Sequence, residues 1–285
     1  MIVTQKQLER AIYEILLMGG GTTEHEAQVM AEELTMSDMM HCNSHGCLRV
    51  PQYIREIRKG QTIPGAEVKI VKETPATAVV DGAFNFGHVA ARKMTEIVIE
   101  KAKKTGVAVV HGINTRHIGR VGAYVQQIAG EGLIGFITAS VFNPWPMIPW
   151  GGTEARLGTN PVAWGAPRYG EDPVFMDGAT TTVSEGKIRN YILDGTLVPE
   201  GWLKDSDGNP TRDPNKLYAD PPGSINPLGG DARGMKGFGL GLMAALFSNA
   251  LNDETYWERT IHDPGKQTYN GVFMMAVDPD FFCGR

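Results

Sequence analysis

A short segment of the chain combines an imidazole, a guanidinium and a phenol, because Ser44, His45 and Gly46 are followed by Arg49 and Tyr53. An imidazole has an ordinary pKa of about 6.5, so it can take or give a proton near neutral pH. A guanidinium pairs with a carboxylate through two parallel hydrogen bonds. Together they suit the oxidation of a 2-hydroxy acid, whose carboxylate needs an anchor and whose hydroxyl needs a proton acceptor. The competing interpretation is a capped helix end that carries a solvent-exposed histidine.

The same segment contains a candidate metal site. His41 and His45 are four residues apart, and Cys42 and Cys47 lie beside them. Imidazole and thiolate are common zinc ligands, but no further ligand follows at a usual spacing, and on a helix Cys42 faces away from both histidines. We therefore expect no bound metal. The alternative is a metal-dependent hydrolase that uses His41, His45 and Cys47.

A second polar cluster follows the apolar segment VAVV. It comprises residues 114–120, with the sequence NTRHIGR, followed by Gly122 and Tyr124. A turn from a strand into a helix presents unpaired backbone N–H groups and the positive end of the helix dipole to phosphates or carboxylates. Glycine and polar residues are also what a plain turn uses, so both interpretations remain open.

Two apparent nucleotide motifs fail on their spacing. In GFGLGL, residues 237–242, the third glycine comes one position early and a polar loop precedes the motif instead of a strand. The segment from Gly178 to Lys187 is too long for a P-loop, and Ile188 stands where serine or threonine is required. We expect neither a Rossmann fingerprint nor ATP hydrolysis. Lys236 precedes an apolar helix and could reach a cofactor phosphate, or it could be a surface lysine.

The composition limits the class of protein. The chain has 285 residues, of which 42% are hydrophobic, and a formal net charge of -5. It is long enough for a full core and two domains, and it has no basic excess that would favour nucleic acid. Three cysteines without a disulfide-like spacing favour a reducing compartment, so we expect a cytoplasmic protein. The sequence shows neither a signal peptide nor a membrane span.

The periodicity of the apolar residues predicts a mixed α/β (α+β) fold. Capped helices are expected after Thr4 and after Thr22 or Thr23, and another helix over about 88–104. Segments rich in β-branched residues predict strands between 68 and 80 and at TGVAVVHGI, GLIGFITASVF and GVFMMAV. GFGLGLMAALFSNAL is apolar nearly all round and predicts a buried helix, whereas 205–231 is too polar and too broken for a regular element.

Six motifs in this order resemble those of one family: NSHGCLRVPQYI, HIGRVGAY, PWGGTEARLGTNPVAWGAP, FMDGATTTVSEGKI, VPEGWLKDSDGNPTRDP and MKGFGLGLM. It is the malate/L-lactate dehydrogenase family of non-Rossmann NAD(P)-dependent oxidoreductases, which also includes ureidoglycolate, sulfolactate and diketogulonate enzymes. The resemblance extends over nearly the whole chain. It implies hydride transfer between NAD or NADP and a small 2-hydroxy or 2-oxo acid. A catalytically silent binding protein of the same fold is a further alternative.

The resemblance also implies how the chain is organised. The expected protein is a homodimer, or a multiple of dimers, with the active site near the subunit boundary. Residues 76–239 form the expected NAD(P)-binding middle domain. Residues 1–75 and 240–285 together form a helical part for the substrate and for dimerisation. Relatives continue past the position of Arg285 with a segment that can contribute to the cofactor pocket.

Matching by motif implies roles for single residues. His45 resembles the acid/base histidine, Ser44 its neighbour in a proton relay, and Arg49 the anchor of the substrate carboxylate. His117 matches a second histidine that has the acid/base role in some relatives, so both histidines remain candidates, and His117 is also an expected substrate contact. Asp177 resembles a carboxylate that acts in a relay or contacts the cofactor.

The remaining expected contacts lie in the second half of the chain. Thr159 is an expected substrate contact. The cofactor contacts implied besides Asp177 are Asn143, Gly178, Ala179, Lys236 and Gly237. Gly178 stands where many relatives have methionine, which should loosen that contact. The choice among malate, lactate, sulfolactate and ureidoglycolate, and between NAD and NADP, stays open.

Overall fold

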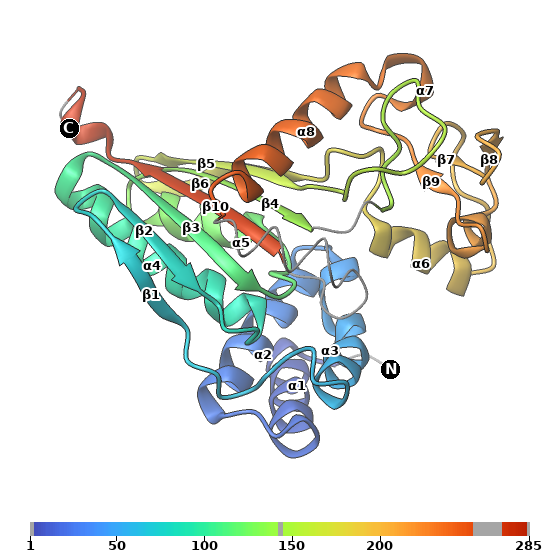
Figure 1. Ribbon diagram of the computed structural model, residues 1–285. Helices are drawn as coiled ribbons and strands as arrows, with labels where there is room; N and C mark the ends of the chain where they lie inside the picture. Colours follow the sequence, from blue (N-terminus) through green and yellow to red (C-terminus); the bar gives the residue numbers. More distant parts are fainter. Residues whose placement is uncertain (1–2, 142–144, 253–269, 284–285) are drawn as a thin grey trace. The chain divides into compact units, whose positions relative to one another are not determined.

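A computed structural model of the chain describes residues 3–141, 145–252 and 270–283 (Figure 1). Its helices are α1 (Gln5–Gly20), α2 (Glu24–Met39), α3 (Val50–Arg58), α4 (Gly87–Thr105), α5 (Gly122–Gly130), α6 (Glu185–Leu193), α7 (Gly230–Arg233) and α8 (Met235–Asn249). Its strands are β1 (Lys69–Glu73), β2 (Thr77–Asp81), β3 (Val107–Thr115), β4 (Ile134–Val141), β5 (Val162–Arg168), β6 (Glu171–Gly178), β7 (Leu203–Lys204), β8 (Pro210–Thr211), β9 (Ser224–Ile225) and β10 (Asn270–Val277). Within these ranges, no helix has the length and apolar character needed to span a membrane.

The strands form a mixed sheet in the order β1-β2-β3-β10-β4-β5-β6 and a small sheet in the order β8-β7-β9. In the larger sheet β2 is parallel to β3, whereas β1 is antiparallel to β2 and β10 is antiparallel to β3. The strands and helices expected between 68 and 141 all occur, and so does the strand expected at GVFMMAV. The predicted mixed α/β fold without a Rossmann arrangement is therefore confirmed.

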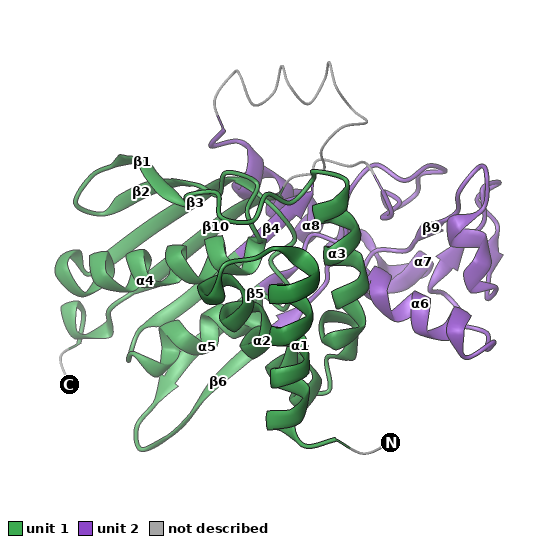
Figure 2. Ribbon diagram, turned by 90° about the horizontal axis from the view of Figure 1, so that it is seen from below, with its two compact units in different colours: residues 1–137, 163–176, 265–285 green, residues 138–162, 177–264 purple. Residues whose placement is uncertain are grey.

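The chain divides into two compact units (Figure 2). Unit 1 comprises residues 1–137, 163–176 and 265–285, and unit 2 comprises 138–162 and 177–264. This division differs from the boundaries expected from the sequence. Residues 76–137 belong to unit 1 because β2 and β3 pair with β1 and β10, and α8 belongs to unit 2.

The first two helices of unit 1 begin with capping boxes. Thr4 accepts a hydrogen bond from the backbone of Gln7, and Thr23 accepts one from the backbone of Glu26. Each box satisfies two N–H groups that the helix itself leaves unpaired. The apolar faces of α1, α2 and α3 then form one core cluster, which includes the fully buried phenol ring of Tyr53.

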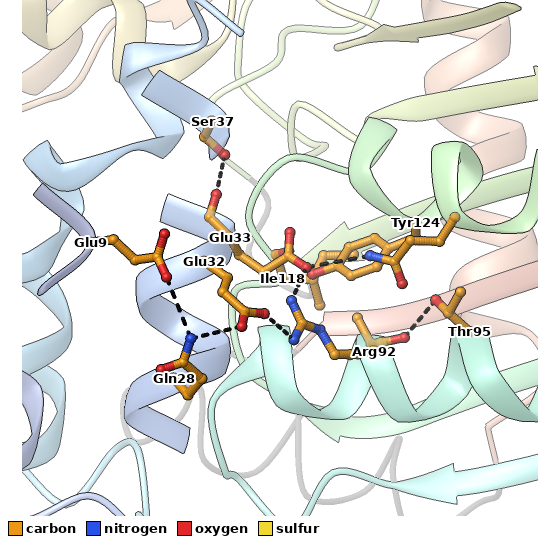
Figure 3. Close-up of polar contacts among 11 residues, drawn as sticks. Glu9, Gln28, Glu32, Glu33, Ser37, Arg92, Thr95, Ile118 and Tyr124 are labelled. Carbon is orange, nitrogen blue, oxygen red and sulfur yellow. Dashed lines mark hydrogen bonds and ion pairs between the residues drawn. The ribbon is translucent and has the colours of Figure 1, made fainter. Parts of the chain in front are cut away.

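Polar contacts in unit 1 join α2 to α4, and another polar contact joins α5 to the loop after β3 (Figure 3). Arg92 on α4 donates to Glu32 at 2.6 Å and to Glu33 at 2.7 Å, both on α2. On α5, Tyr124 donates to the backbone carbonyl of Ile118 at 2.5 Å. Ile118 is in the loop after β3, so this bond fixes the loop that carries the second predicted histidine.

In unit 2, residues 205–231 contain regular elements, so the prediction that this segment has none is wrong. This segment includes β8, β9, a 3-10 helix at Pro214–Tyr218 and the first residues of α7. Leu217 and Ile225 are fully buried in a core cluster with Val198 and Leu203. The elements are too short to produce a periodic pattern, and a few apolar side chains suffice to anchor them.

Helix α8 forms as predicted. The prediction that this helix is buried is wrong for the single chain. Its buried residues are mostly small ones, including Gly237, Gly241 and Ala244. Its large apolar side chains are exposed, namely Met235, Leu240, Leu242, Met243, Leu246 and Phe247. An apolar helix without an apolar cover is typical of a surface that binds another protein.

Candidate functional site

The segment that carries His45 is a sharp turn in unit 1 between α2 and α3. His41 has a positive φ of 57°, and two 3-10 turns follow, Asn43–His45 and Cys47–Arg49. The backbone N–H of Cys47 donates to the Asp38 carboxylate at 2.8 Å. A Cβ at Gly46 would collide with that carboxylate, so a larger residue there would displace Asp38 from this hydrogen bond. The turn is therefore fixed by α2 itself.

The structure brings the two predicted histidines together. The rings of His45 and His117 stack with their centroids 5.6 Å apart and their planes inclined by 14°. The Nδ1 atom of His45 is hydrogen-bonded to the Ser44 hydroxyl at 2.9 Å, and Nδ1 of His117 is hydrogen-bonded to the Tyr53 hydroxyl at 2.9 Å. Neither Nε2 atom has a hydrogen-bond partner within the described ranges. Each ring is thus oriented through one nitrogen and leaves the other for chemistry.

A third histidine, His88 on α4, packs behind this pair. Its ring lies edge-on to the rings of Tyr53 and His117, with ring centroids 5.6 Å and 6.1 Å apart, respectively. Gly119, in the loop after β3, has a φ of 72°, and a Cβ there would collide with the imidazole of His88. Sequence reasoning did not single out His88, because it is the second residue of an ordinary helix and no motif marks it.

All three imidazoles are held in the neutral form. Burial, and next the positive charges of Arg49 and Arg120, together lower the pKa of His45 to about 3. Burial likewise lowers the pKa of His88 to about 3, and it lowers that of His117 well below the usual value. A neutral imidazole keeps one nitrogen lone pair, so His45 and His117 are in the protonation state that a proton acceptor needs before reaction.

Arg49 is positioned by a chain of polar contacts on and near α3. Its Nε donates to the carbonyl of Ser44 at 2.6 Å, and its Nη1 donates to Gln52 at 2.7 Å. Gln52 in turn donates to Glu56 at 2.8 Å, and Glu56 pairs with Arg116 at 3.2 Å. This network holds the guanidinium beside the histidines. Gln52 and Glu56 were missed in the sequence, although their i, i+3 and i+4 spacing to Arg49 and to each other fits one helix face.

The structure does not support the metal site considered at His41, His45 and Cys47. Among the residues that the structure describes, no three His, Cys, Asp or Glu side chains lie together as a metal site would require. Burial of the sulfur, and next its hydrogen bond to Asp38, raise the pKa of Cys47 to about 11. Metals bind the thiolate, which this environment disfavours. The hydrolase hypothesis built on His41, His45 and Cys47 is therefore not supported.

The residues expected to bind the cofactor are in unit 2, apart from Asn143, which lies outside the described residues. Asp177 and Gly178 end β6, Ala179 follows, and all three are half-buried. The backbone carbonyl of Thr159 accepts hydrogen bonds from the N–H and the hydroxyl of Thr180. These contacts join the two Thr-containing segments within the unit.

The first turn of α8 fits an anionic group such as a cofactor phosphate. No side chain caps its N-terminus, where Gly234 is the cap residue. Lys236 is exposed there and has no ion-pair partner within the described part of the chain. Gly237 packs directly on the backbone of Leu228, where a Cβ would collide. Unpaired N–H groups and a lysine form a suitable environment for a phosphate.

Comparison with known proteins assigns the chain to a family. A profile of the malate/L-lactate dehydrogenase family matches residues 3–285. A malate dehydrogenase from Pyrococcus abyssi is 37% identical over 92% of this chain and 72% of its own length. An L-sulfolactate dehydrogenase from Methanocaldococcus jannaschii is 35% identical over 100% of this chain and 80% of its own length.

A solved structure agrees with these sequence matches. The crystal structure of malate dehydrogenase from Entamoeba histolytica superposes with a TM-score of 0.90 and 29% identity, over 99% of this chain and 80% of that one. The match therefore includes elements of both units. The chain belongs to the malate/L-lactate dehydrogenase family and is a 2-hydroxy-acid dehydrogenase of that type.

Proposed function

We propose that the chain catalyses the reversible oxidation of a small 2-hydroxy acid to the 2-oxo acid, with NAD or NADP as the hydride carrier. The observation that carries this proposal is the stacked pair of His45 and His117, each with a hydroxyl on Nδ1 and with Arg49 held nearby. A proton acceptor and a carboxylate anchor are the two groups that this reaction needs from the protein. Candidate substrates are malate, lactate, sulfolactate and ureidoglycolate.

Arg49 holds the carboxylate on C1 of the substrate. Its bonds to Ser44 and Gln52 restrict the guanidinium to one orientation before the substrate arrives. A preorganised guanidinium binds a carboxylate through parallel hydrogen bonds and fixes C2 relative to the histidines. Thr159 is a further proposed substrate contact.

A histidine removes the hydroxyl proton. In the oxidation, the O–H proton on C2 passes to Nε2 of His45 or of His117, C2 loses its hydrogen as a hydride, and the C–O bond becomes a carbonyl. The nicotinamide ring, when bound, supplies the hydride acceptor. Ser44 orients His45 and can pass its proton on, and Tyr53 has the equivalent position at His117. In the reduction the same histidine returns the proton to the carbonyl oxygen.

The cofactor is held by unit 2. Lys236 and the first turn of α8 would bind its phosphates, in keeping with the uncapped helix and the exposed lysine. The other proposed contacts are Asn143, Asp177, Gly178, Ala179 and Gly237. Asp177 would orient the site or contact the ribose, since a carboxylate accepts hydrogen bonds from hydroxyl groups.

The working form is a homodimer or a multiple of dimers. The support for this proposal is the exposed apolar surface of α8, which a second copy would cover. A cytoplasmic location fits the three cysteines, Cys42, Cys47 and Cys283, because their spacing is unlike that of a disulfide framework.

The experiment that tests the function follows absorbance at the reduced-nicotinamide band. Purified protein is mixed with NADH or NADPH in turn and with a panel of 2-oxo acids that includes oxaloacetate, pyruvate and sulfopyruvate. Oxidation of the cofactor by one acid supports the reaction class and identifies both cofactor and substrate. Failure with every acid and both cofactors would refute the proposal, provided that circular dichroism shows folded protein.

A further inference from the structure

Arg120 differs from the other buried arginines near the histidines. Arg49, Arg116 and Arg120 are only 7%, 4% and 6% exposed. Arg49 has the polar partners described above, and Arg116 pairs with Glu56. For Arg120 no carboxylate lies within reach among the described residues, and its buried Nε has no hydrogen-bond partner there. Its guanidinium lies over the ring of Phe175, 6.0 Å from the centroid.

The described residues compensate the buried positive charge of Arg120 only in part. A charge removed from water is strongly unfavourable unless an opposite charge or hydrogen-bond acceptors compensate it. The face of Phe175 compensates only part of that loss. An anion that binds with the substrate would supply the rest, so the environment of Arg120 is that of a ligand-binding residue.

The position of Arg120 places it at the candidate active site. It comes three residues after His117 in the same loop. Gly119, between them, packs so closely on His88 that no Cβ fits, and the His88 ring contacts the His117 ring. The charge of Arg120 also reaches His45, whose pKa it helps to lower after burial and Arg49. Arg120 and Arg49 therefore both act on the same imidazole.

We infer that Arg120 binds a second anionic group of the substrate, at the end distant from C1. This inference rests on the proposed function, because it leaves the C1 carboxylate to Arg49. The substrates selected are 2-hydroxy acids that carry a distal carboxylate or sulfonate. An acid with an uncharged end would leave Arg120 buried and uncompensated, and such a site rejects the ligand that lacks the matching group.

A pair of 2-oxo acids tests this residue. Oxaloacetate has a distal carboxylate, and 2-oxobutanoate has a methyl group in its place. We expect Arg120→Met to lower kcat/KM for oxaloacetate by about 100-fold while 2-oxobutanoate changes by less than about threefold. Arg120→Lys, which retains the charge, should recover part of the loss. The matched control is Arg10→Met, at an exposed arginine of α1, which should change neither value.

Three outcomes would overturn the inference. An equal loss with both acids would mean that Arg120 supports the fold or the shared chemistry. A higher KM for NADH or NADPH, with no change in the preference between acids, would mean that Arg120 binds a phosphate of the cofactor. A wild-type enzyme that does not prefer oxaloacetate to 2-oxobutanoate would show that the distal anion is not recognised.

A binding measurement separates this inference from the proposed reaction. Calorimetry in the presence of NADH compares L-malate with L-2-hydroxybutanoate, and neither can react because acid and cofactor are both reduced. Tighter binding of malate, lost in Arg120→Met, supports the inference even if no 2-oxo acid is turned over. Equal binding of the two acids to the wild type refutes it, whatever the assay of turnover shows.

Discussion

His45 and His117 come from different elements of unit 1, yet their imidazole rings stack 5.6 Å apart and each uses Nδ1 to bond a hydroxyl. Two imidazoles at this distance titrate as a pair, because a proton on one disfavours a proton on the other. At most one of them therefore carries the proton taken from the substrate. The partner hydroxyls, from Ser44 and Tyr53, distinguish the two rings.

Single substitutions should identify the acid/base histidine. His45→Gln or His117→Gln, whichever removes the base, should lower kcat by about 10²- to 10⁴-fold with little change in KM. The other variant should retain most of the rate. Steady-state kinetics of both variants checks this. Ser44→Ala should lower kcat in the same direction as His45→Gln but by less, and Tyr53→Phe should do the same relative to His117→Gln. Equal, small losses in both histidine variants would contradict the assignment.

Arg49→Lys should mainly raise KM for the acid. The lysine keeps the charge but loses the planar fork and the bonds to Ser44 and Gln52. We expect an increase of about 10- to 100-fold in KM, with a smaller change in kcat. Arg10→Lys on the surface of α1 is the control. An unchanged KM for the acid would remove Arg49 from the substrate site.

Stability should fall with decreasing pH below about 6.5, the ordinary pKa of histidine. His45 and His88 have folded-state pKa values of about 3, so between these limits the unfolded chain binds protons that the folded chain does not. Each buried histidine then adds a slope of about 1.4 kcal/mol per pH unit. Urea unfolding at several pH values measures the slope. His88→Gln should reduce it by about one such step, and an unchanged slope would show that His88 titrates normally.

Chelation should leave the activity intact. The described residues offer no set of three metal ligands, and Cys47 is held as a thiol by its raised pKa. Treatment with EDTA followed by the nicotinamide assay should give the untreated rate, and Cys47→Ala should be equally active. Loss of activity that zinc restores would revive the metal-dependent alternative.

A charge on α8 should weaken the proposed dimer. Leu246 and Phe247 are among its exposed apolar residues, and Leu246→Glu would place a carboxylate in the covered interface. Light scattering should show a shift toward the monomer, whereas Met18→Glu on the exposed end of α1 should leave the mass unchanged. A wild-type monomer would refute the proposal directly.

The sequence by itself determined the elements and the family. Apolar periodicity and capping residues predicted α1, α2, α4 and β3, because these features depend on neighbours only three or four residues away. The order of six motifs identified the family. Residue type and spacing singled out His45 and Arg49, and the match to the family's motifs added His117 as a second acid/base candidate.

Tertiary structure decided what these residues contact. The approach of His117 to His45 and the position of His88 behind them depend on how β3, α4 and the turn after α2 pack. The same packing leaves Nε of Arg120 without a hydrogen-bond partner among the described residues. The exposure of α8 could not be read from its sequence, because an all-apolar helix has the same pattern whether its own chain or another one covers it. Periodicity records which side chains are apolar, and only packing determines what covers them.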